Sequence, residues 1–369
     1  TMPLITTPPS PLDDPSVEDP LSCPPLRWGI LGCGRVAHDF CLAMKHLPTQ
    51  VLAGCAARSL SSAETFAKTH NVEKAYGSYD ELIADENVQI IYVANLHVFR
   101  RTTGEKCLNA GKHILMEKPF ACSAADASYL AGLAKEKNLF AMEGMWTRFF
   151  PAVEQARRAV FGSETEKGIM GDVVAVQSDF SFNASDSEEY PTSFFYNHDL
   201  GGGASFLVGP YPTAAALMFF KSPPSEIKCV GQMDPACGVD LQSMCVLNFP
   251  PTGEVAPASD PSNTEENTPK LPGAGTATLF WGLLGESVEE TVAIGTKGRL
   301  TIHSPGHCPT KLTIVIKGEG RGGAGAIYEY DFELPKDEER EKAAGGYVYP
   351  NSSGFAYEAA AVARLIAAG

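Results

Sequence analysis

The sequence has few basic residues, no long apolar run and no C-x-x-C pair of cysteines. Lysine and arginine number 29 against 44 aspartates and glutamates, which gives a net charge of -15. This balance argues against nucleic acid or an anionic membrane as a partner, because both attract basic surfaces. A helix needs about 20 consecutive apolar residues to cross a bilayer, and no stretch of the sequence approaches this length. The charge does not argue against one phosphorylated cofactor, which needs only local positive charge.

The ten cysteines are not spaced as a disulfide framework, and Cys33, Cys55 and Cys245 lie within apolar runs. This pattern is typical of reduced thiols, so we expect a cytoplasmic protein.

Three residues, His303, His307 and Cys308, are close enough in the sequence to suggest a metal site. They flank Pro305-Gly306 in a predicted turn. No further ligand lies nearby in the sequence, so we expect no metal site.

Three segments lie outside the expected folded core. Residues 1–25 are rich in proline and acidic residues, which predicts a disordered tail. A mitochondrial presequence would instead be rich in arginine and poor in acidic residues. The polar, proline-rich segment 250–275 is predicted to be a flexible insertion. The chain stops partway through or just after a helical pattern, at residues 367–369, which suggests a shortened form of a longer protein.

The strongest local motif is a glycine-rich turn that follows the apolar strand Leu26–Leu31 and opens a helix. The segment 32–37 reads G-x-G-x-x-A, in which small residues permit a tight turn and a close approach to a pyrophosphate. The helix N-terminus then supplies N–H groups to the phosphates. A second G-x-G-x-x-G, at 318–323, lies between two strand patterns and predicts a hairpin instead. The predicted cofactor-binding residues of the first turn are Gly32, Gly34, Arg35, Val36 and Ala37.

Arg58 follows the second predicted strand, Val51–Ala57, at the position that selects between dinucleotides. An acidic residue there would bind the ribose hydroxyls of NAD, whereas arginine suits the additional 2′-phosphate of NADP. We therefore expect NADP rather than NAD. The alternative is a solvated arginine that opens the next helix.

Strands and helices alternate over residues 26–149, which predicts a parallel, doubly wound Rossmann sheet that binds NADP. Residues 150–369 instead show many strand patterns with few helices, which predicts an α+β domain with a large, mainly antiparallel open sheet. One apolar helix, Ser205–Phe220, follows the glycine run 201–203, and a last helix covers Ser353–Ala368.

Four motifs together resemble the glucose–fructose oxidoreductase/inositol dehydrogenase (Gfo/Idh/MocA) family: the glycine-rich turn, Ala94-Asn95-Leu96-His97, Ala110-Gly111-Lys112-His113 and Glu117-Lys118-Pro119. The segment 143–151, EGMWTRFFP, is similar to the branch of dimeric dihydrodiol dehydrogenases, which also act as NADP-dependent D-xylose dehydrogenases. The resemblance covers about residue 27 to the end and implies a homodimer.

The resemblance also implies roles for single residues. Lys118 would stabilise charge on the substrate oxygen, with a cis bond to Pro119, and Tyr211 would act as its general acid/base partner. The cofactor would contact Asn95, His97, Glu117, Lys118 and Trp146, and the substrate would contact Trp146, Arg148, Phe149, Leu207 and Tyr211. Without the resemblance, His97 is equally well a loop histidine, and Tyr211 is more often a core residue.

The chain departs from the family pattern on the expected substrate side. Leu207 stands at the position of an aspartate, Leu96 replaces a proline, Arg100 stands where a second histidine is common, and Phe194 replaces an arginine. We therefore expect that NADP binding is kept and that sugar specificity is altered or weakened.

The sequence thus predicts an NADP-dependent oxidoreductase of CH–OH groups in a vicinal diol or an aldose. Two alternatives are a reductase of keto-sugars or dicarbonyls, and a catalytically weak NADP-binding sensor, which Leu207 favours.

Overall fold

The computed structural model describes residues 19–162, 168–184, 190, 192–220, 222–251, 273–318 and 323–369. Most of the predicted tail and of the predicted insertion, residues 1–18 and 252–272, lies outside this range. The chain forms two compact units. Unit 1 contains residues 1–154, 197–201 and 332–369, and unit 2 contains residues 155–196 and 202–331.

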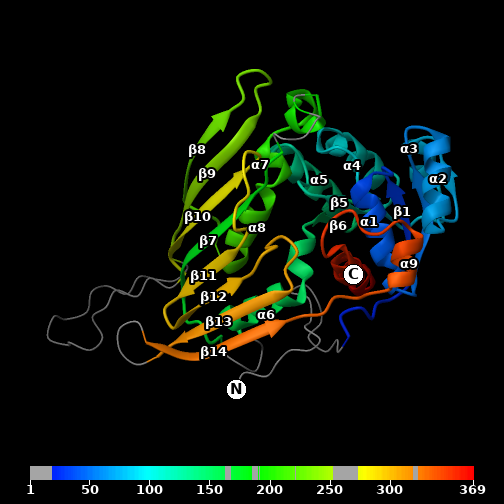
Figure 1. Cartoon of the computed structure of the whole chain (residues 1–369). Coiled ribbons are helices and arrows are strands. Elements are labelled where there is room, and N and C mark those ends of the chain that lie inside the picture. Colours follow the sequence, from blue (N-terminus) through cyan, green and yellow to red (C-terminus); the bar gives the residue numbers. More distant parts are fainter. Residues whose placement is uncertain are drawn as a thin grey trace. The chain divides into compact units, whose positions relative to one another are not determined.

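Unit 1 is built on a six-stranded parallel sheet with the order β3-β2-β1-β4-β5-β6. Figure 1 labels β1, β5 and β6 of this sheet. Its strands are β1 (Leu26–Leu31), β2 (Gln50–Ala56), β3 (Ala75–Tyr76), β4 (Ile90–Val93), β5 (His113–Glu117) and β6 (Ala141–Gly144). Its helices are α1 (Arg35–Ala43), α2 (Leu60–His70), α3 (Tyr79–Ala84), α4 (Arg100–Asn109), α5 (Ala124–Glu136), α9 (Glu338–Ala343) and α10 (Phe355–Ala368). The predicted doubly wound parallel sheet is confirmed. The two-residue strand β3 and the short helix α9 have no counterpart in the sequence prediction.

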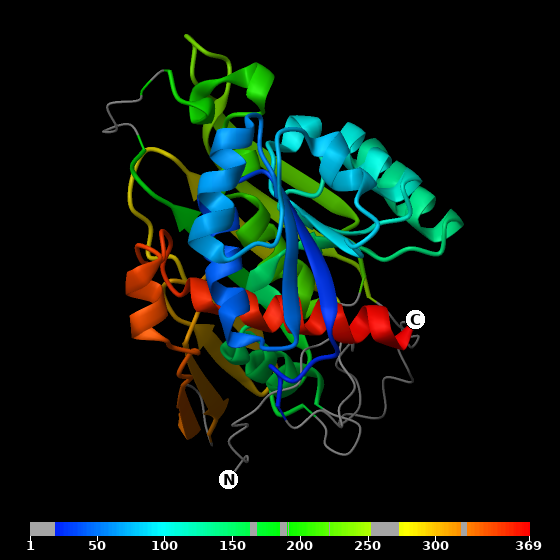
Figure 2. The same cartoon turned by 90° about the vertical axis from the view of Figure 1, so that its right-hand side faces the viewer.

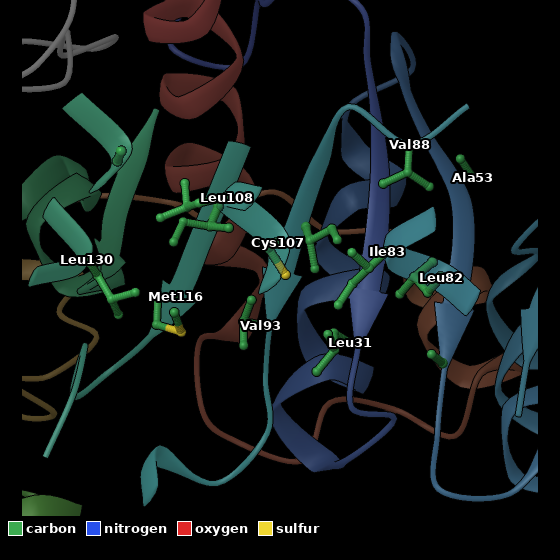
Figure 3. Packing of buried hydrophobic residues seen from close by; sticks show 14 residues of the cluster. Leu31, Ala53, Leu82, Ile83, Val88, Val93, Cys107, Leu108, Met116 and Leu130 are labelled. Carbon is green, nitrogen blue, oxygen red and sulfur yellow. The ribbon is translucent and has the colours of Figure 1, made fainter. Parts of the chain in front are cut away.

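Both faces of this sheet are buried, which explains why its central strands read as continuous apolar runs. On one face, Leu31, Val93 and Met116 from three strands pack against Leu108 of α4 and Leu130 of α5 (Figure 3).

On the other face, aromatic rings from the strands, α1 and α10 pack together. Phe40 stacks on Tyr92 at 3.9 Å between ring centroids and also meets Trp28 and Phe355. The packing of this second face thus requires α10, which begins more than 200 residues after the last strand of the sheet, β6.

The C-terminal segment 332–369 packs with unit 1, whereas the sequence predicted that it belongs to the second domain. Figure 2 shows α10, in red, beside the blue strands and helices of the N-terminal region. The physical reason is the fully buried carboxylate of Asp39 in α1, which accepts hydrogen bonds from Val348 N (2.8 Å), Tyr349 N (2.9 Å) and Ser352 Oγ (2.6 Å). A strand-and-helix count along the sequence does not reveal such a long-range anchor.

Residues 19–25 are not part of a disordered tail, so the tail prediction is wrong for this short segment. Leu21 packs against Phe149 and Tyr357, and Arg364 of α10 donates to the carbonyls of Pro20 (2.8 Å) and Ser22 (2.6 Å). The composition of the segment did not show these tertiary contacts.

Unit 2 is built on an eight-stranded sheet with the order β14-β13-β12-β11-β7-β10-β9-β8. All neighbours pair antiparallel except β7 and β10, so the predicted large, mainly antiparallel sheet is confirmed. The pairing of β13 with β14 also confirms that the second glycine motif connects a hairpin. The strands are β7 (Val173–Ser181), β8 (Glu226–Met233), β9 (Asp240–Phe249), β10 (Gly275–Gly282), β11 (Thr291–Gly295), β12 (Gly298–Ile302), β13 (Lys311–Lys317) and β14 (Ala324–Asp331).

The apolar helix predicted over Ser205–Phe220 is two helices, α7 (Ala204–Leu207) and α8 (Pro210–Phe219). Pro210 has no N–H to continue the first helix and stands at the first position of the second, which proline favours. Gly209 is needed at the junction, because an added Cβ would lie 2.7 Å from Ser205 O. Helix α6 (Pro151–Phe161) precedes them in the chain.

Cys229 and Cys245 form a disulfide between directly opposite positions of β8 and β9. The expectation of a reduced thiol is therefore wrong for Cys245. The apolar run around Cys245 reflects its place on the buried face of β9, where the neighbouring strand presents a second cysteine. No helix of the described residues is long and apolar enough to cross a membrane.

The Asp39 anchor predicts the stability of unit 1. Asp39→Ala removes the buried acceptor of the Val348 and Tyr349 N–H groups and of the Ser352 hydroxyl, and it is expected to lower the free energy of unfolding by about 3 kcal/mol. Ser352→Ala removes one bond of the same anchor and is expected to cost about 1 kcal/mol. Urea unfolding measures both values, and equal stability of Asp39→Ala and wild type would contradict the role of the anchor.

Candidate active site

The glycine-rich turn leads from β1 into α1 as the sequence predicted. Gly32 has a φ of +98°, and an added Cβ would lie 3.0–3.1 Å from the backbone of Ala94 and Asn95. Gly34 is the N-cap of α1, and nothing lies within 4 Å of the position of an added Cβ. Arg35 and Val36 form the exposed and half-exposed start of the helix, and Ala37 is buried against the sheet. This turn leaves open space at a helix N-terminus, which is what a pyrophosphate requires.

Arg58 is exposed two residues past the end of β2 and directly before Ser59, the N-cap of α2. The Ser59 hydroxyl accepts a hydrogen bond from Ser62 N at 3.3 Å, so the start of this helix is fixed locally. The guanidinium therefore lies at the end of the second parallel strand, where a dinucleotide carries its adenosine ribose.

The segment after β4 carries Asn95 and His97, both buried. The Asn95 amide donates to Thr103 Oγ1 at 2.9 Å, while its Oδ1 is buried without a partner in the described residues. A buried amide oxygen without a donor is costly, so this atom fits a ligand that brings a hydrogen-bond donor. Gly32, Gly34 and Asn95 together fit a bound dinucleotide.

His97 lies close to the backbone of residue 201, which also belongs to unit 1. Its Nε2 donates to Gly201 O at 2.7 Å, which fixes the tautomer with Nδ1 as an acceptor. Burial lowers the pKa of His97 to about 4, and the cations of Arg100 and Lys118 act in the same direction. The imidazole is therefore neutral at physiological pH.

Glu117 and Lys118 end strand β5. Glu117 is buried and accepts from Tyr92 Oη at 2.6 Å and from Lys118 N at 3.2 Å. Burial raises the pKa of the Glu117 carboxyl, which the charges of Arg100 and Lys118 oppose. The bond between Lys118 and Pro119 is cis, as the resemblance implied.

The Lys118 amine is half-buried, and its pKa is lowered to about 8, far below the 10.5 of a free lysine. Burial is the main cause, and the Arg100 cation adds to it, whereas Glu117 and Glu143 oppose it. An amine with this pKa exchanges a proton near neutral pH, which is the requirement for an acid–base group.

Three predicted contact residues follow β6. Trp146 is almost fully buried, and its ring stacks on Phe355 at 4.2 Å between centroids. Phe149 is buried in a cluster with Tyr357 of α10. Arg148, which lies between these two residues in the sequence, is half-buried. The structure thus places Trp146 and Phe149 in the packing of α10, and Arg148 is the more exposed of the three.

Tyr211 and Leu207 belong to unit 2 and are half-buried in α8 and at the end of α7. The Tyr211 ring meets Phe180 of β7 at 5.4 Å and His307 at 5.3 Å between centroids, and Phe180 stacks on His307 at 4.7 Å. The His307 ring is held by Glu289, which contacts its Nδ1. Tyr211 therefore has its ring in an aromatic cluster, with a carboxylate-bound histidine as one wall.

Sequence reasoning missed several of these groups. It treated Arg100 only as a departure from the family pattern, whereas Arg100 is buried and donates to Asn95 O, Glu117 O and Pro119 O. It considered His307 only as a metal ligand, and Phe180 not at all. The alternating pattern of β7 placed Phe180 in a strand, and the sequence placed His307 at a predicted turn. Their contact with Tyr211 depends on the strand order, which the local sequence does not give.

The N-terminal part of the chain, residues 26–145, matches the family model described as "Oxidoreductase family, NAD-binding Rossmann fold". Residues 163–256 match the GFO/IDH/MocA C-terminal domain. Trans-1,2-dihydrobenzene-1,2-diol dehydrogenase of Sus scrofa is 33% identical over 349 residues, which is 93% of this chain and 89% of that protein. The same enzyme of Xenopus tropicalis is 30% identical over 347 residues, with 93% and 90% coverage.

Solved structures with the same fold include two further oxidoreductases. The apo form of a levoglucosan dehydrogenase has a TM-score of 0.71 at 16% identity, covering 94% of this chain and 90% of that one. A 3-ketoreductase from Actinomadura kijaniata in complex with NADP and TDP-benzene has a TM-score of 0.64 at 20% identity, covering 94% and 98%. At these identities, the two structures support the fold alone.

Proposed function

The chain belongs to the Gfo/Idh/MocA family of NAD(P)-binding oxidoreductases that act on CH–OH groups, and from this premise we propose that it is an NADP-dependent dehydrogenase of a vicinal diol or an aldose. The observation that carries the proposal is the Lys118 amine, held at the end of β5 with a pKa of about 8. Trans-dihydrodiols and D-xylose are the two substrates that we expect first.

NADP, rather than NAD, is the proposed cofactor. Arg58 brings positive charge to the end of β2, and no acidic residue takes the place of a ribose ligand there. The turn at Gly32 and Gly34 would hold the pyrophosphate, and the orphaned Oδ1 of Asn95 would accept a hydrogen bond from the cofactor. Neutral His97 and buried Glu117 would border the nicotinamide half.

The chemistry follows from the protein's own residues. The bound nicotinamide would supply or accept the hydride. Lys118, when protonated, donates a hydrogen bond to the substrate oxygen and stabilises its developing negative charge. Tyr211 is the second proton-handling group, and its ring is oriented by Phe180 and His307. Trp146 and Arg148 are proposed substrate contacts, of which Arg148 is the more accessible.

Leu207 favours a second candidate function, a catalytically weak NADP-binding sensor. A leucine cannot accept a hydrogen bond from a substrate hydroxyl, and a site built for such a bond loses much of its discrimination without it. Reduction of a keto-sugar or dicarbonyl is the third candidate and uses the same residues in the opposite direction.

A homodimer is the proposed assembly. Helices α7 and α8 contact one face of the unit 2 sheet. On the opposite face, Val230 of β8 stands opposite Met244 of β9, next to Val246, with 74%, 55% and 46% of these side chains exposed. A contiguous apolar patch on an open sheet face is typical of a protein–protein interface. A second copy of the chain would cover it.

Cofactor choice is tested by calorimetry with NADP, NADPH and NAD. Wild type is expected to bind NADP in the micromolar range, and Arg58→Ala to bind it about tenfold more weakly, which is about 1.4 kcal/mol. Arg101→Ala is the matched control, because Arg101 is a surface arginine paired with Glu105 and Asp126. If the wild type binds neither NADP nor NAD, the proposed function is contradicted.

The effect of Leu207 is tested by NADPH formation with D-xylose. Wild type is expected to turn over D-xylose weakly, and Leu207→Asp to raise kcat/KM about tenfold, because it restores an acceptor for a hydroxyl. Leu217→Asp, on the exposed side of α8, is the control. The variants Lys118→Met and Tyr211→Phe give the rate of NADPH formation that remains when one of the two proton-handling groups is absent. A kcat/KM of Leu207→Asp no higher than that of wild type would refute the role given to Leu207.

The homodimer is tested by light scattering after size-exclusion chromatography. The double variant Val230→Glu, Met244→Glu is expected to be monomeric, because burying two carboxylates in the interface is unfavourable. Val288→Glu, an equally exposed valine outside the sheet, is expected to remain a dimer. A monomeric wild type would rule out this assembly.

A further inference from the structure

We propose that Arg100 is a positioning residue for Lys118, in that its buried guanidinium fixes the backbone around the amine and supplies a neighbouring positive charge. This proposal rests on the proposed role of Lys118 as a proton-handling group. It gives a function to a residue that the sequence marked only as a departure from the family pattern.

The geometry of Arg100 connects two strand ends. Its Nε donates to Asn95 O at 3.1 Å, in the segment after β4. Its Nη1 donates to Glu117 O and, at 2.5 Å, to Pro119 O, on either side of Lys118. One side chain thus holds both residues that flank the amine, together with the segment that carries the proposed cofactor contacts.

Arginine is suited to this place because of its planar fork of donors. A lysine has a single ammonium group that cannot reach both segments in the same way, and a histidine has two donors at most. Arg100 is 5% exposed, so water does not replace its bonds. Truncating it would leave the buried carbonyls of Asn95 and Glu117 and the half-buried carbonyl of Pro119 without this donor.

The charge of Arg100 acts on Lys118 directly. All three of its hydrogen bonds go to backbone carbonyls, so the nearby carboxylates only partly offset its charge. Burial lowers the pKa of the guanidinium, and Glu117, Tyr92, Cys122 and Glu143 oppose this change. The group stays charged at physiological pH.

Four further groups near the amine are titratable. Glu117 of β5 and Glu143 of β6 raise the pKa of Lys118, and His97 is neutral. From α10, Glu358 is fully buried, and its burial together with the charges of Glu117 and Glu143 raises its pKa well above the ordinary value.

Arg100 is thus the cation that opposes the two glutamates at Lys118.

Two variants separate position from charge. Arg100→Lys keeps a cation but loses the fork, so we expect kcat to fall about tenfold or more, with the pH profile little changed. Arg100→Met loses both, so we expect the same fall together with a shift of the Lys118 titration by about one pH unit upward. The sign follows from the loss of a like charge, which makes protonation of the amine easier. A role in packing alone would not move the pH profile.

The experiment uses the full chain with NADP and its best diol or aldose substrate. The pH dependence of kcat and kcat/KM is measured for wild type and both variants, with Arg101→Met as a surface control that keeps the wild-type profile. In parallel, the pH dependence of Lys118 modification by an amine-reactive reagent is followed by peptide mass spectrometry. This second readout needs no turnover.

The outcomes distinguish the two proposals. An upward shift of Lys118 modification in Arg100→Met without any wild-type turnover would support the positioning role and contradict the proposed activity. An unchanged modification midpoint in Arg100→Met, or wild-type kcat in Arg100→Lys, would overturn the positioning role. If Arg100→Met does not fold, Arg100→Lys still decides through kcat, because it keeps the charge and most of the volume.

Discussion

The proposed site depends on the burial of several charged groups at the ends of adjacent parallel strands. Glu117, Arg100 and Lys118 lie within or beside the core of unit 1, where each charge would be costly alone. They persist because Tyr92 and backbone groups supply hydrogen bonds and because the opposite charges offset one another. The same burial brings the pKa of the Lys118 amine close to the physiological pH range, so the cost of burial and the proposed chemistry have one origin.

The parallel sheet itself makes this burial possible. With both faces covered, the strand interiors are mostly apolar, and most polar groups of the sheet lie near the strand ends. Asn95 follows the neighbouring strand β4, Lys118 follows β5, and Arg58 follows β2 on the other side of β1, so three strands of one parallel sheet present polar groups at the same edge. In unit 2, Tyr211 depends on different means: a proline–glycine junction that starts α8, and aromatic contacts from β7 and the segment before β13.

The sequence predicted most of the fold, because periodicity and turn residues are local signals. The strands of both sheets, the hairpin at 318–323 and the parallel topology all follow from such signals. The C-terminal segment on unit 1, the disulfide of Cys229 with Cys245 and the break at Pro210 did not, although the proline was visible in the sequence. For the site, the glycine turn and the E-K-P motif were readable, whereas the part played by Arg100 required its three acceptors from two segments. No local pattern encodes three carbonyls that meet at one guanidinium.

The return of residues 332–369 to the first unit has a consequence for biosynthesis. The ribosome releases the six strands of the parallel sheet long before it makes α10, and until then the rings of Phe40, Trp146 and Phe149 lack the helix that covers them. Proteins commonly complete an N-terminal domain during translation, but this one cannot close its first unit until the second has been synthesised. The intervening unit therefore emerges while an apolar groove is still open, which makes chaperone binding during synthesis advantageous for this topology.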